Sequence, residues 1–328
     1  METGRYHKLC KFSYFNRAIR QSKFQSYVYL NNPKSACSSI KQNLHMYEYR
    51  QGNIDSLPST GKQLHSKERI FAENWNLEDP QQWFIFSFVR NPFVRLLSAY
   101  LDKIVRALPP KKHLSKIMGF SVQQNISFDE FIDMVSNLSP EQDDRHWGIQ
   151  SENILISSIP IHFLGYVEYI NSDLNLLWEN FFREPSYQFT SWRRHHTDAK
   201  ELLQQYYTKT SERLVLSKYE RDFVNFGYGD NINYIEPIRL SRSFSMSESM
   251  AFVLSAYSLA NYGMKRKAIN KLYQAEILFP EYRKLYKSCL GEISNFNKKP
   301  IRSPSGSLHI NLNAIKQNLK NSKIVLHK

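Results

Sequence analysis

Short, almost continuous apolar runs alternate with stretches of helical spacing over most of the first 230 residues of the chain. The runs Tyr27–Leu30 and 83–89 have the apolar character of strands buried on both faces, as in parallel sheets. Helical spacing follows each run, over residues 38–47 and from Pro92 to about residue 106, and a proline suits the first turn of a helix. This alternation predicts a mostly parallel sheet flanked by helices.

The alternation continues downstream with weaker signals. Residues 128–136 and 173–182 have helical spacing, and 161–167 predicts a strand. Leu214-Val215-Leu216 predicts a further short strand, followed by a tyrosine-rich helical segment. Residues 50–64 are rich in Gly, Ser, Pro and Asn and predict a loop.

The pattern changes at both ends of the chain. Residues 1–26 are basic and aromatic and lack the apolar core of a signal peptide. From about residue 231 the sequence is polar and serine-rich, and over about 249–282 it matches one tetratricopeptide-like hairpin of two helices. One such unit cannot build a solenoid, so we expect it to pack on the main domain. We therefore expect a lead-in over 1–26, a central domain over 27–230 and a helical extension with a basic tail over 231–328.

Composition narrows the class of protein. A hydrophobic share of 41% in 328 residues is ordinary for a soluble globular chain, and no run approaches the roughly 18 apolar residues of a membrane span. The net charge of +14 favours an anionic partner, such as nucleic acid, an acidic polysaccharide or a polyphosphate ligand, unless it serves solubility alone. Three widely spaced cysteines argue against a disulfide framework and a cysteine zinc site, and they favour the cytoplasm.

The loop after the first predicted strand has the chemistry of a phosphate site. Each of the first two predicted strands is followed by the start of a helix, where free N–H groups and the positive end of the helix dipole attract anions. Residues 32–39 add Lys34 and the hydroxyls of Ser38 and Ser39, without the glycines and the GK[ST] ending of a Walker motif. The second strand ends in Val89-Arg90 where a Mg²⁺-binding aspartate would be usual. An ATPase, a GTPase or a P-loop kinase is therefore not expected.

The loop after the second strand supplies a second cationic site. Arg90 can form forked hydrogen bonds to a phosphate, and the hydroxyl of Ser98 can complete the shell. Arg95 could do the same, or lie solvated on the helix surface. Two such sites in neighbouring loops predict a ligand with two separate phosphates.

Together these stretches resemble the sulfotransferases that use 3′-phosphoadenosine-5′-phosphosulfate (PAPS), in particular the carbohydrate, family 2-like branch. Residues 33–39 match the pattern P-K-x-x-C-[ST]-S, and residues 89–100 match V-R-[DEN]-P-[FY]-x-R-L-x-S-[AG]-[YF]. Weaker similarities follow at 145–150, 163–168 and 219–228. Eukaryotic members are usually anchored in the secretory pathway. The lack of an anchor here suggests a bacterial member.

The resemblance implies an α/β, P-loop-like three-layer fold with a central mostly parallel sheet, here followed by the C-terminal α-helical extension. It implies that Lys34 neutralises the leaving phosphate oxygen, that Arg90 and Ser98 bind the 3′-phosphate, and that no metal is needed. The implied acceptor is a hydroxyl of a carbohydrate or another polar molecule, and nucleic acid is not expected as a partner. The 5′-phosphosulfate would be bound by Lys34, Ser35, Ala36, Cys37, Ser38 and Ser39.

The acceptor hydroxyl needs a general base, which in this family is a glutamate or a histidine. We favour His65, which lies between the two motifs, because histidine titrates near neutral pH. His146 competes with it, either as the base or as an acceptor ligand. Further candidates are His45, Glu68 and Glu73. The alternative function is a non-catalytic nucleotide- or polyanion-binding protein on the same scaffold.

Overall fold

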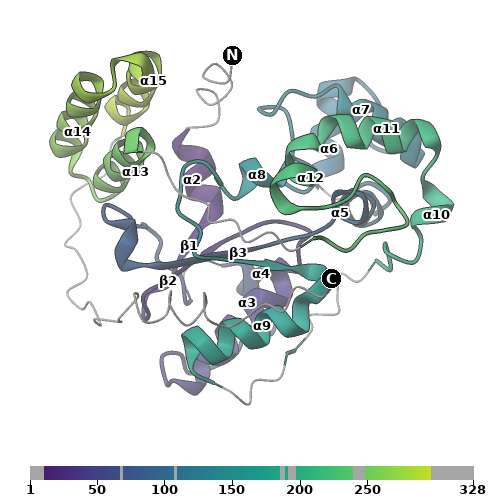
Figure 1. The fold of residues 1–328 in the computed structure, drawn as a ribbon, viewed down its shortest axis with the longest axis horizontal. Coiled ribbons are helices and arrows are strands. Elements are labelled where there is room, and N and C mark those ends of the chain that lie inside the picture. The colour runs from purple at the N-terminus through teal and green to yellow at the C-terminus, as the bar shows by residue number, and fades with distance from the viewer. Residues whose placement is uncertain are drawn as a thin grey trace.

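The architecture is a three-layer sandwich with a sheet between two layers of helices (Figure 1). The structure is a computed structural model, and it describes residues 11–66, 69–106, 109–184, 189–190, 197–238 and 248–296. The sheet has the order β1-β2-β3-β4, and the pairs β2–β3 and β3–β4 are parallel. The α/β class and the mostly parallel sheet are therefore confirmed. The strands are β1 (Ile19–Gln21), β2 (Tyr27–Leu30), β3 (Phe84–Val89) and β4 (Phe163–Tyr166).

The helices fall into a main body and a C-terminal group. Five-residue π-helical turns extend two of them, at Tyr100–Ile104 and Trp178–Phe182. The main body contains α2 (Phe12–Ala18), α3 (Cys37–Arg50), α4 (Gly61–His65), α5 (Pro92–Ala99), α6 (Pro109–Met118), α7 (Phe128–Ser136), α8 (Gln150–Asn153), α9 (Ile170–Leu177), α10 (Leu203–Tyr206), α11 (Lys209–Lys218) and α12 (Glu220–Phe226). The C-terminal group contains α13 (Glu248–Asn261), α14 (Lys265–Leu278) and α15 (Arg283–Ser294).

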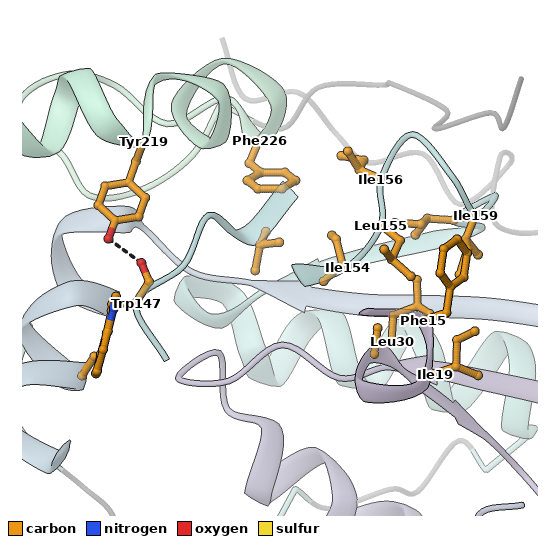
Figure 2. Packing of buried hydrophobic residues seen from close by; sticks show 14 of the residues in the cluster. Phe15, Ile19, Leu30, Trp147, Ile154, Leu155, Ile156, Ile159, Tyr219 and Phe226 are labelled. Atoms are coloured by element: carbon orange, nitrogen blue, oxygen red, sulfur yellow. Dashed lines mark hydrogen bonds between the residues drawn. The ribbon is translucent and has the colours of Figure 1, made fainter. Parts of the chain in front are cut away.

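The continuous apolar strands bury both of their faces, and the two faces differ in chemistry. Strands β2 and β3 turn aromatic side chains, among them Tyr29 and Phe86, toward α3 and α9. They turn aliphatic side chains toward α2 and α5 on the opposite face. Figure 2 shows part of this second layer, with Leu30 close to Phe15 and Ile19. Burial of both faces explains why these strands have no alternation of apolar and polar residues.

Parallel pairing places the two candidate loops at one edge of the sheet. Leu30, the last residue of β2, pairs with Ser87 of β3, so both strands run out toward the same side. The loop that carries Lys34 and the loop that carries Arg90 therefore lie beside each other. This is the edge where ligands bind in open α/β sheets.

Two local predictions are wrong. Residues 214–216 lie in α11 and form no strand. Thr208 caps that helix by accepting from the Ser211 N–H, Val215 is buried, and the helix packs on α7. A three-residue apolar run is compatible with either element, and here the cap decides for the helix. The predicted loop over 50–64 also contains the start of α4, which Thr60 caps through the Gln63 N–H.

The N-terminal segment takes part in the sheet. Residues 12–21, within the expected lead-in, form α2 and the edge strand β1, which pairs antiparallel with β2. Arg145 donates to the carbonyls of Arg17 and Asn31, and so connects this segment to the body of the domain.

The C-terminal helices pack on the main body. Helices α13 and α14 form the hairpin that the sequence predicts, and Gly263 has the positive φ of 77° that the turn requires. Leu77 N donates to Ser258 Oγ (2.9 Å), and Asn261 Nδ2 donates to the Trp75 carbonyl (2.9 Å). Helix α15 was not predicted. The likeness to a tetratricopeptide unit stays a prediction, and the tail beyond residue 296 lies outside the described residues.

Gly165 in β4 provides a test of this packing. A Cβ at this position would lie 2.3 Å from Cε1 of Phe88, whose ring is fully buried, so the surrounding core would have to shift. We expect Gly165→Ala to lower the free energy of unfolding by about 1–3 kcal/mol, as overpacking does, measured by urea denaturation. The control is Gly291→Ala in α15, where a Cβ meets open space, and it should stabilise by about 0.5–1 kcal/mol. Equal effects of the two substitutions would contradict the packing described here.

Candidate functional site

The loop between β2 and α3 adopts an unusual backbone conformation. Lys34 (φ 67°) and Ala36 (φ 54°) both lie in the left-handed region, although neither is a glycine. Left-handed residues in a turn are typical of backbone nests that bind anions, and non-glycine residues in this region cluster at functional sites. Ala36 precedes α3 and offers no side-chain oxygen to cap it. The N-terminus of a 14-residue helix is thus available to an anion.

A cavity of about 410 Å³ opens at this edge of the sheet. It brings together Lys34, Arg90 and Ser98 from the two motifs, as well as the histidines His65 and His146. Of the six residues expected around the 5′-phosphosulfate, all except Ser35 line it. The remaining lining residues are Pro33, Ala36, Cys37, Ser38, Ser39, Asp102, Lys103, Val167, Ile170, Phe189, Thr197, Asp198, Ala199, Lys200 and Glu201.

The amide of Gln150 joins the two loops. Its Oε1 accepts from Asn32 Nδ2, from Ser35 Oγ and from Arg90 N, each at 3.0 Å. Its Nε2 donates to the Arg90 carbonyl at 2.7 Å. Gln150 is fully buried, so these bonds are shielded from water. The hydroxyl of Ser35 is therefore engaged in holding the loop, away from the cavity.

Arg95 clamps the first loop from the other side. The side chain is buried, and its guanidinium donates to the carbonyls of Pro33 (3.0 Å), Gly148 (2.8 Å) and Arg145 (2.8 Å). Burial lowers the pKa of Arg95. Neither expectation from the sequence holds, because this arginine is not solvated and its donors are directed to the protein. Its role is to fix the loop that carries Lys34.

Lys34 reaches into the cavity and pairs with a carboxylate. Its Nζ lies 3.0 Å from Oδ2 of Asp102. Burial lowers the pKa of Lys34 to about 8, even though Asp102 raises it. Burial also acts to raise the pKa of Asp102, but Lys34 and Lys103 outweigh it and hold that pKa well below its usual range. The protonation of Lys34 therefore depends on the charged groups around it.

The second motif contributes a guanidinium and a hydroxyl to the same cavity. Burial lowers the pKa of Arg90, and its Nη1 lies 3.5 Å from the carbonyl of Lys34. Ser98 Oγ lies 2.9 Å from Oγ1 of Thr197, which comes from a segment about a hundred residues later. Asn91 caps α5 by accepting from Phe93 N, and this cap fixes where the helix begins.

Both favoured histidines line the cavity, with different partners. His65 is exposed at the end of α4, with Nε2 3.3 Å from Ser38 Oγ and Nδ1 2.8 Å from Nζ of Lys41. Burial lowers the pKa of Lys41 to about 8. The Nδ1 of His146 contacts Oδ1 of Asp144. Burial lowers the pKa of His146, whereas Asp144 raises it.

The other base candidates do not reach the cavity or cannot be placed. His45 is fully buried, donates from Nδ1 to the Lys41 carbonyl, and has its pKa lowered to about 4 by burial. Glu73 is exposed and does not line the cavity. Glu68 lies outside the described residues. Of the five candidates, the structure brings His65 and His146 together with Lys34 and Arg90.

Three contributors to the site were not predicted. Gln150 lies in one of the stretches of weaker similarity, and its position in the sequence does not indicate the two loops that it bridges. Asp102 lies two residues after the second motif, but a π-helical turn decides its direction. The segment 197–201 lines the cavity from a part of the chain without a recognised motif. The charged residues Asp198, Lys200 and Glu201 were the feature of the sequence that could have marked this segment as part of the site.

The part of the chain that contains this site is similar to known proteins. The sequence model described as "Sulfotransferase family" matches residues 17–229, which include both loops and the cavity residues. The human protein named carbohydrate sulfotransferase 14 is 25% identical over 229 residues, which are 65% of this chain and 60% of that protein. Its counterpart in Danio rerio is 28% identical over 224 residues, covering 62% and 59%.

These relatives are longer than the matched region. The chain spans about three fifths of their length. No solved structure matches the chain significantly. Among the helices that the structure describes, none is both long and apolar enough to traverse a lipid bilayer.

Gln150 offers a test of how the site is held. Gln150→Leu keeps the approximate size of the side chain but removes the acceptor of Ser35 Oγ and of Arg90 N and the donor to the Arg90 carbonyl, whereas Asn32 Nδ2 keeps the Phe88 carbonyl as an acceptor. Each buried polar group without a partner costs about 1–3 kcal/mol, so we expect a loss of more than about 3 kcal/mol in the free energy of unfolding, measured with urea. Gln205→Leu, on an exposed face of α10, is the control and should stay within about 0.5 kcal/mol of the unchanged protein. A loss at Gln150 no larger than at Gln205 would show that the bridge contributes nothing.

Proposed function

The chain belongs to the sulfotransferase family, and we propose that it transfers a sulfuryl group from PAPS to a hydroxyl of a carbohydrate or another polar acceptor. The observation that carries this proposal is that Lys34 and Arg90, from the ends of two adjacent parallel strands, line one cavity. Two cationic loops at one cavity fit a ligand with two separate phosphates. The carbohydrate class of acceptor rests on the names of the relatives.

In the proposed reaction the acceptor oxygen attacks sulfur in line with the leaving group. A bond forms between this oxygen and sulfur, and the bond between sulfur and the 5′-phosphate oxygen breaks with its electron pair on the phosphate. Lys34 neutralises that developing charge, while Ser38, Ser39 and the first amides of α3 hold the 5′-phosphate. Arg90 and Ser98 hold the 3′-phosphate. The protein contributes positioning and electrostatics, and the mechanism does not call for a metal.

We propose His65 as the base that receives the acceptor proton. Its Nε2 lies against Ser38, at the helix end that would hold the phosphosulfate. An ammonium can only donate, so a charged Lys41 places the ring proton of a neutral His65 on Nε2. His65 acts as a base there only after Lys41 gives up a proton. His146 is the second candidate, because it lines the cavity and Asp144 can accept from Nδ1, which leaves the lone pair on Nε2.

The donor assignment predicts a preference for the bisphosphate product. We expect 3′,5′-adenosine diphosphate to raise the melting temperature by several degrees more than ADP, AMP or ATP with Mg²⁺, measured by thermal shift. Arg90→Ala should abolish this preference, because the group for the 3′-phosphate is removed. The matched control is Arg213→Ala, which removes an exposed arginine of α11 outside the cavity lining and should keep the preference. A preference for ATP with Mg²⁺ would favour a kinase instead.

The assignment of His65 as the base predicts that its replacement lowers turnover but leaves nucleotide binding unchanged. With PAPS and a panel of polysaccharides, we expect His65→Asn to reduce kcat by about 10²–10⁴-fold with little change in the affinity for 3′,5′-adenosine diphosphate. His146→Asn is the matched comparison and should keep kcat within about tenfold. The reverse pattern would assign the base to His146. Tight binding without turnover on any acceptor would favour the non-catalytic alternative.

The place where the protein acts stays a prediction. The cytoplasm was favoured because of the cysteine content, and Cys37 and Cys289 are both free thiols in the part of the chain that the structure describes. Fractionation of the native cell would test this location. The origin in a bacterium likewise stays a prediction.

A further inference from the structure

A buried carboxylate faces the cavity that is proposed to bind a highly anionic donor. Asp102 lines this cavity, and its side chain is only 2% exposed. A negative charge at such a position opposes the binding of phosphates and sulfate. Because this carboxylate weakens the binding of an anionic ligand, we expect it to have another function in the site.

The local backbone directs Asp102 to its place. Helix α5 changes at Tyr100 into a five-residue π-helical turn, closed by a bond of 3.1 Å from Val105 N to the Tyr100 carbonyl. The wider turn rotates the following side chains relative to those of a regular α-helix. Such turns are rare and are frequently found at functional sites. Here the turn brings Asp102 and Lys103 to the cavity.

Three cations surround this one carboxylate. Its Oδ2 lies 3.0 Å from Nζ of Lys34 and 2.9 Å from Nζ of Lys103, and its Oδ1 lies 3.3 Å from Nη1 of Arg106. A single carboxylate oxygen thus bridges two ammonium groups, as an oxygen of a bound oxyanion would. Asp102 therefore occupies, in charge and in contacts, the position of an anionic ligand of Lys34.

We propose that Asp102 is the positioning residue that keeps Lys34 charged and directed into the cavity before the donor binds. The ion pair between Lys34 and Asp102 is then replaced by one between Lys34 and the donor. This inference rests on the proposed function. When the donor is absent, the carboxylate is the counter-ion of the lysine. When the donor binds, its phosphosulfate takes over that role, and Lys103 and Arg106 retain Asp102.

The charges around Lys34 explain why it needs this partner. Burial, Lys103 and Arg90 all lower its pKa, and Asp102 is the group that raises it. His146 is also coupled to Lys34 and Lys103, and it would add a further positive charge if protonated. Without the carboxylate, Lys34 would lose its proton at a lower pH. An opposite charge at this distance typically shifts a pKa by about 1–3 units.

The test is the pH dependence of PAPS turnover in Asp102→Asn, which keeps the shape of the side chain and removes its charge. Lys34 acts in its protonated form, so activity is present below its pKa and lost above it. We expect the alkaline limb of kcat/KM, which reports the free enzyme, to move down by about one unit or more. The limb of kcat should move less, because the bound donor supplies negative charge. At pH 6.5, 3′,5′-adenosine diphosphate should bind several-fold more tightly to this variant.

Two further variants keep the result interpretable. Lys103→Met removes a like charge and should move the alkaline limb of kcat/KM to higher pH, even if Asp102→Asn fails to fold. Lys34→Arg replaces the titrating group by one that stays charged, and in that background Asp102→Asn should shift nothing. An alkaline limb that is unmoved, or moved equally in kcat and kcat/KM, would overturn the inference. If the unchanged protein neither binds the bisphosphate nor turns over PAPS, it is the proposed function that fails.

Discussion

The side-chain amide of Gln150 is the interaction on which the site depends. A parallel sheet brings the ends of β2 and β3 to one edge, but it does not fix the loops that follow them. Gln150 does so, since one buried oxygen accepts from both loops and the nitrogen returns a bond to the carbonyl of Arg90. In a buried position these bonds are strong, and breaking those to Ser35 or to Arg90 leaves an unpaired polar group.

Gln150 is in turn held by the end of the domain. Asp222 in α12 accepts from the backbone N–H groups of Gln150 (2.7 Å) and Ser151 (2.8 Å), at the start of α8. The hydroxyl of Tyr219 donates to the carbonyl of Trp147, as Figure 2 shows. Two of the stretches with weaker similarity, 145–150 and 219–228, therefore support the two loops from behind. The residues of this supporting layer need not contact the ligand for the site to require them.

The features predicted correctly from the sequence are those that neighbouring residues along the chain determine. Continuous apolar runs identified β2 and β3 because both faces of these strands are buried, and the motifs identified Lys34 and Arg90. The sequence did not predict the direction of Arg95, because a helical arginine that donates to three distant carbonyls cannot be distinguished from a solvated one along the chain. The strand predicted over residues 214–216 was wrong because a short apolar run fits a strand and a helix equally well. Helix α15 was missed although its buried residues Leu285, Cys289 and Ile293 recur at helical spacing. The position of Asp102 could not be predicted because it depends on a π-helical turn, and no residue type indicates such a turn in the sequence.

The buried cations connect ligand binding to stability. Arg95 and Arg145 lie behind the first loop and donate to carbonyls, and burial lowers the pKa of Arg145 to about 9. Burial likewise acts on Lys34 and Lys41. The region around the loop is thus positively charged in a medium where water cannot fully screen it, and this charge is a cost to the folded state. An anionic ligand that binds only the folded protein would offset this electrostatic cost and stabilise the fold. The repulsion among these buried cations, which destabilises the ligand-free protein, is therefore the source of the attraction that would hold the donor.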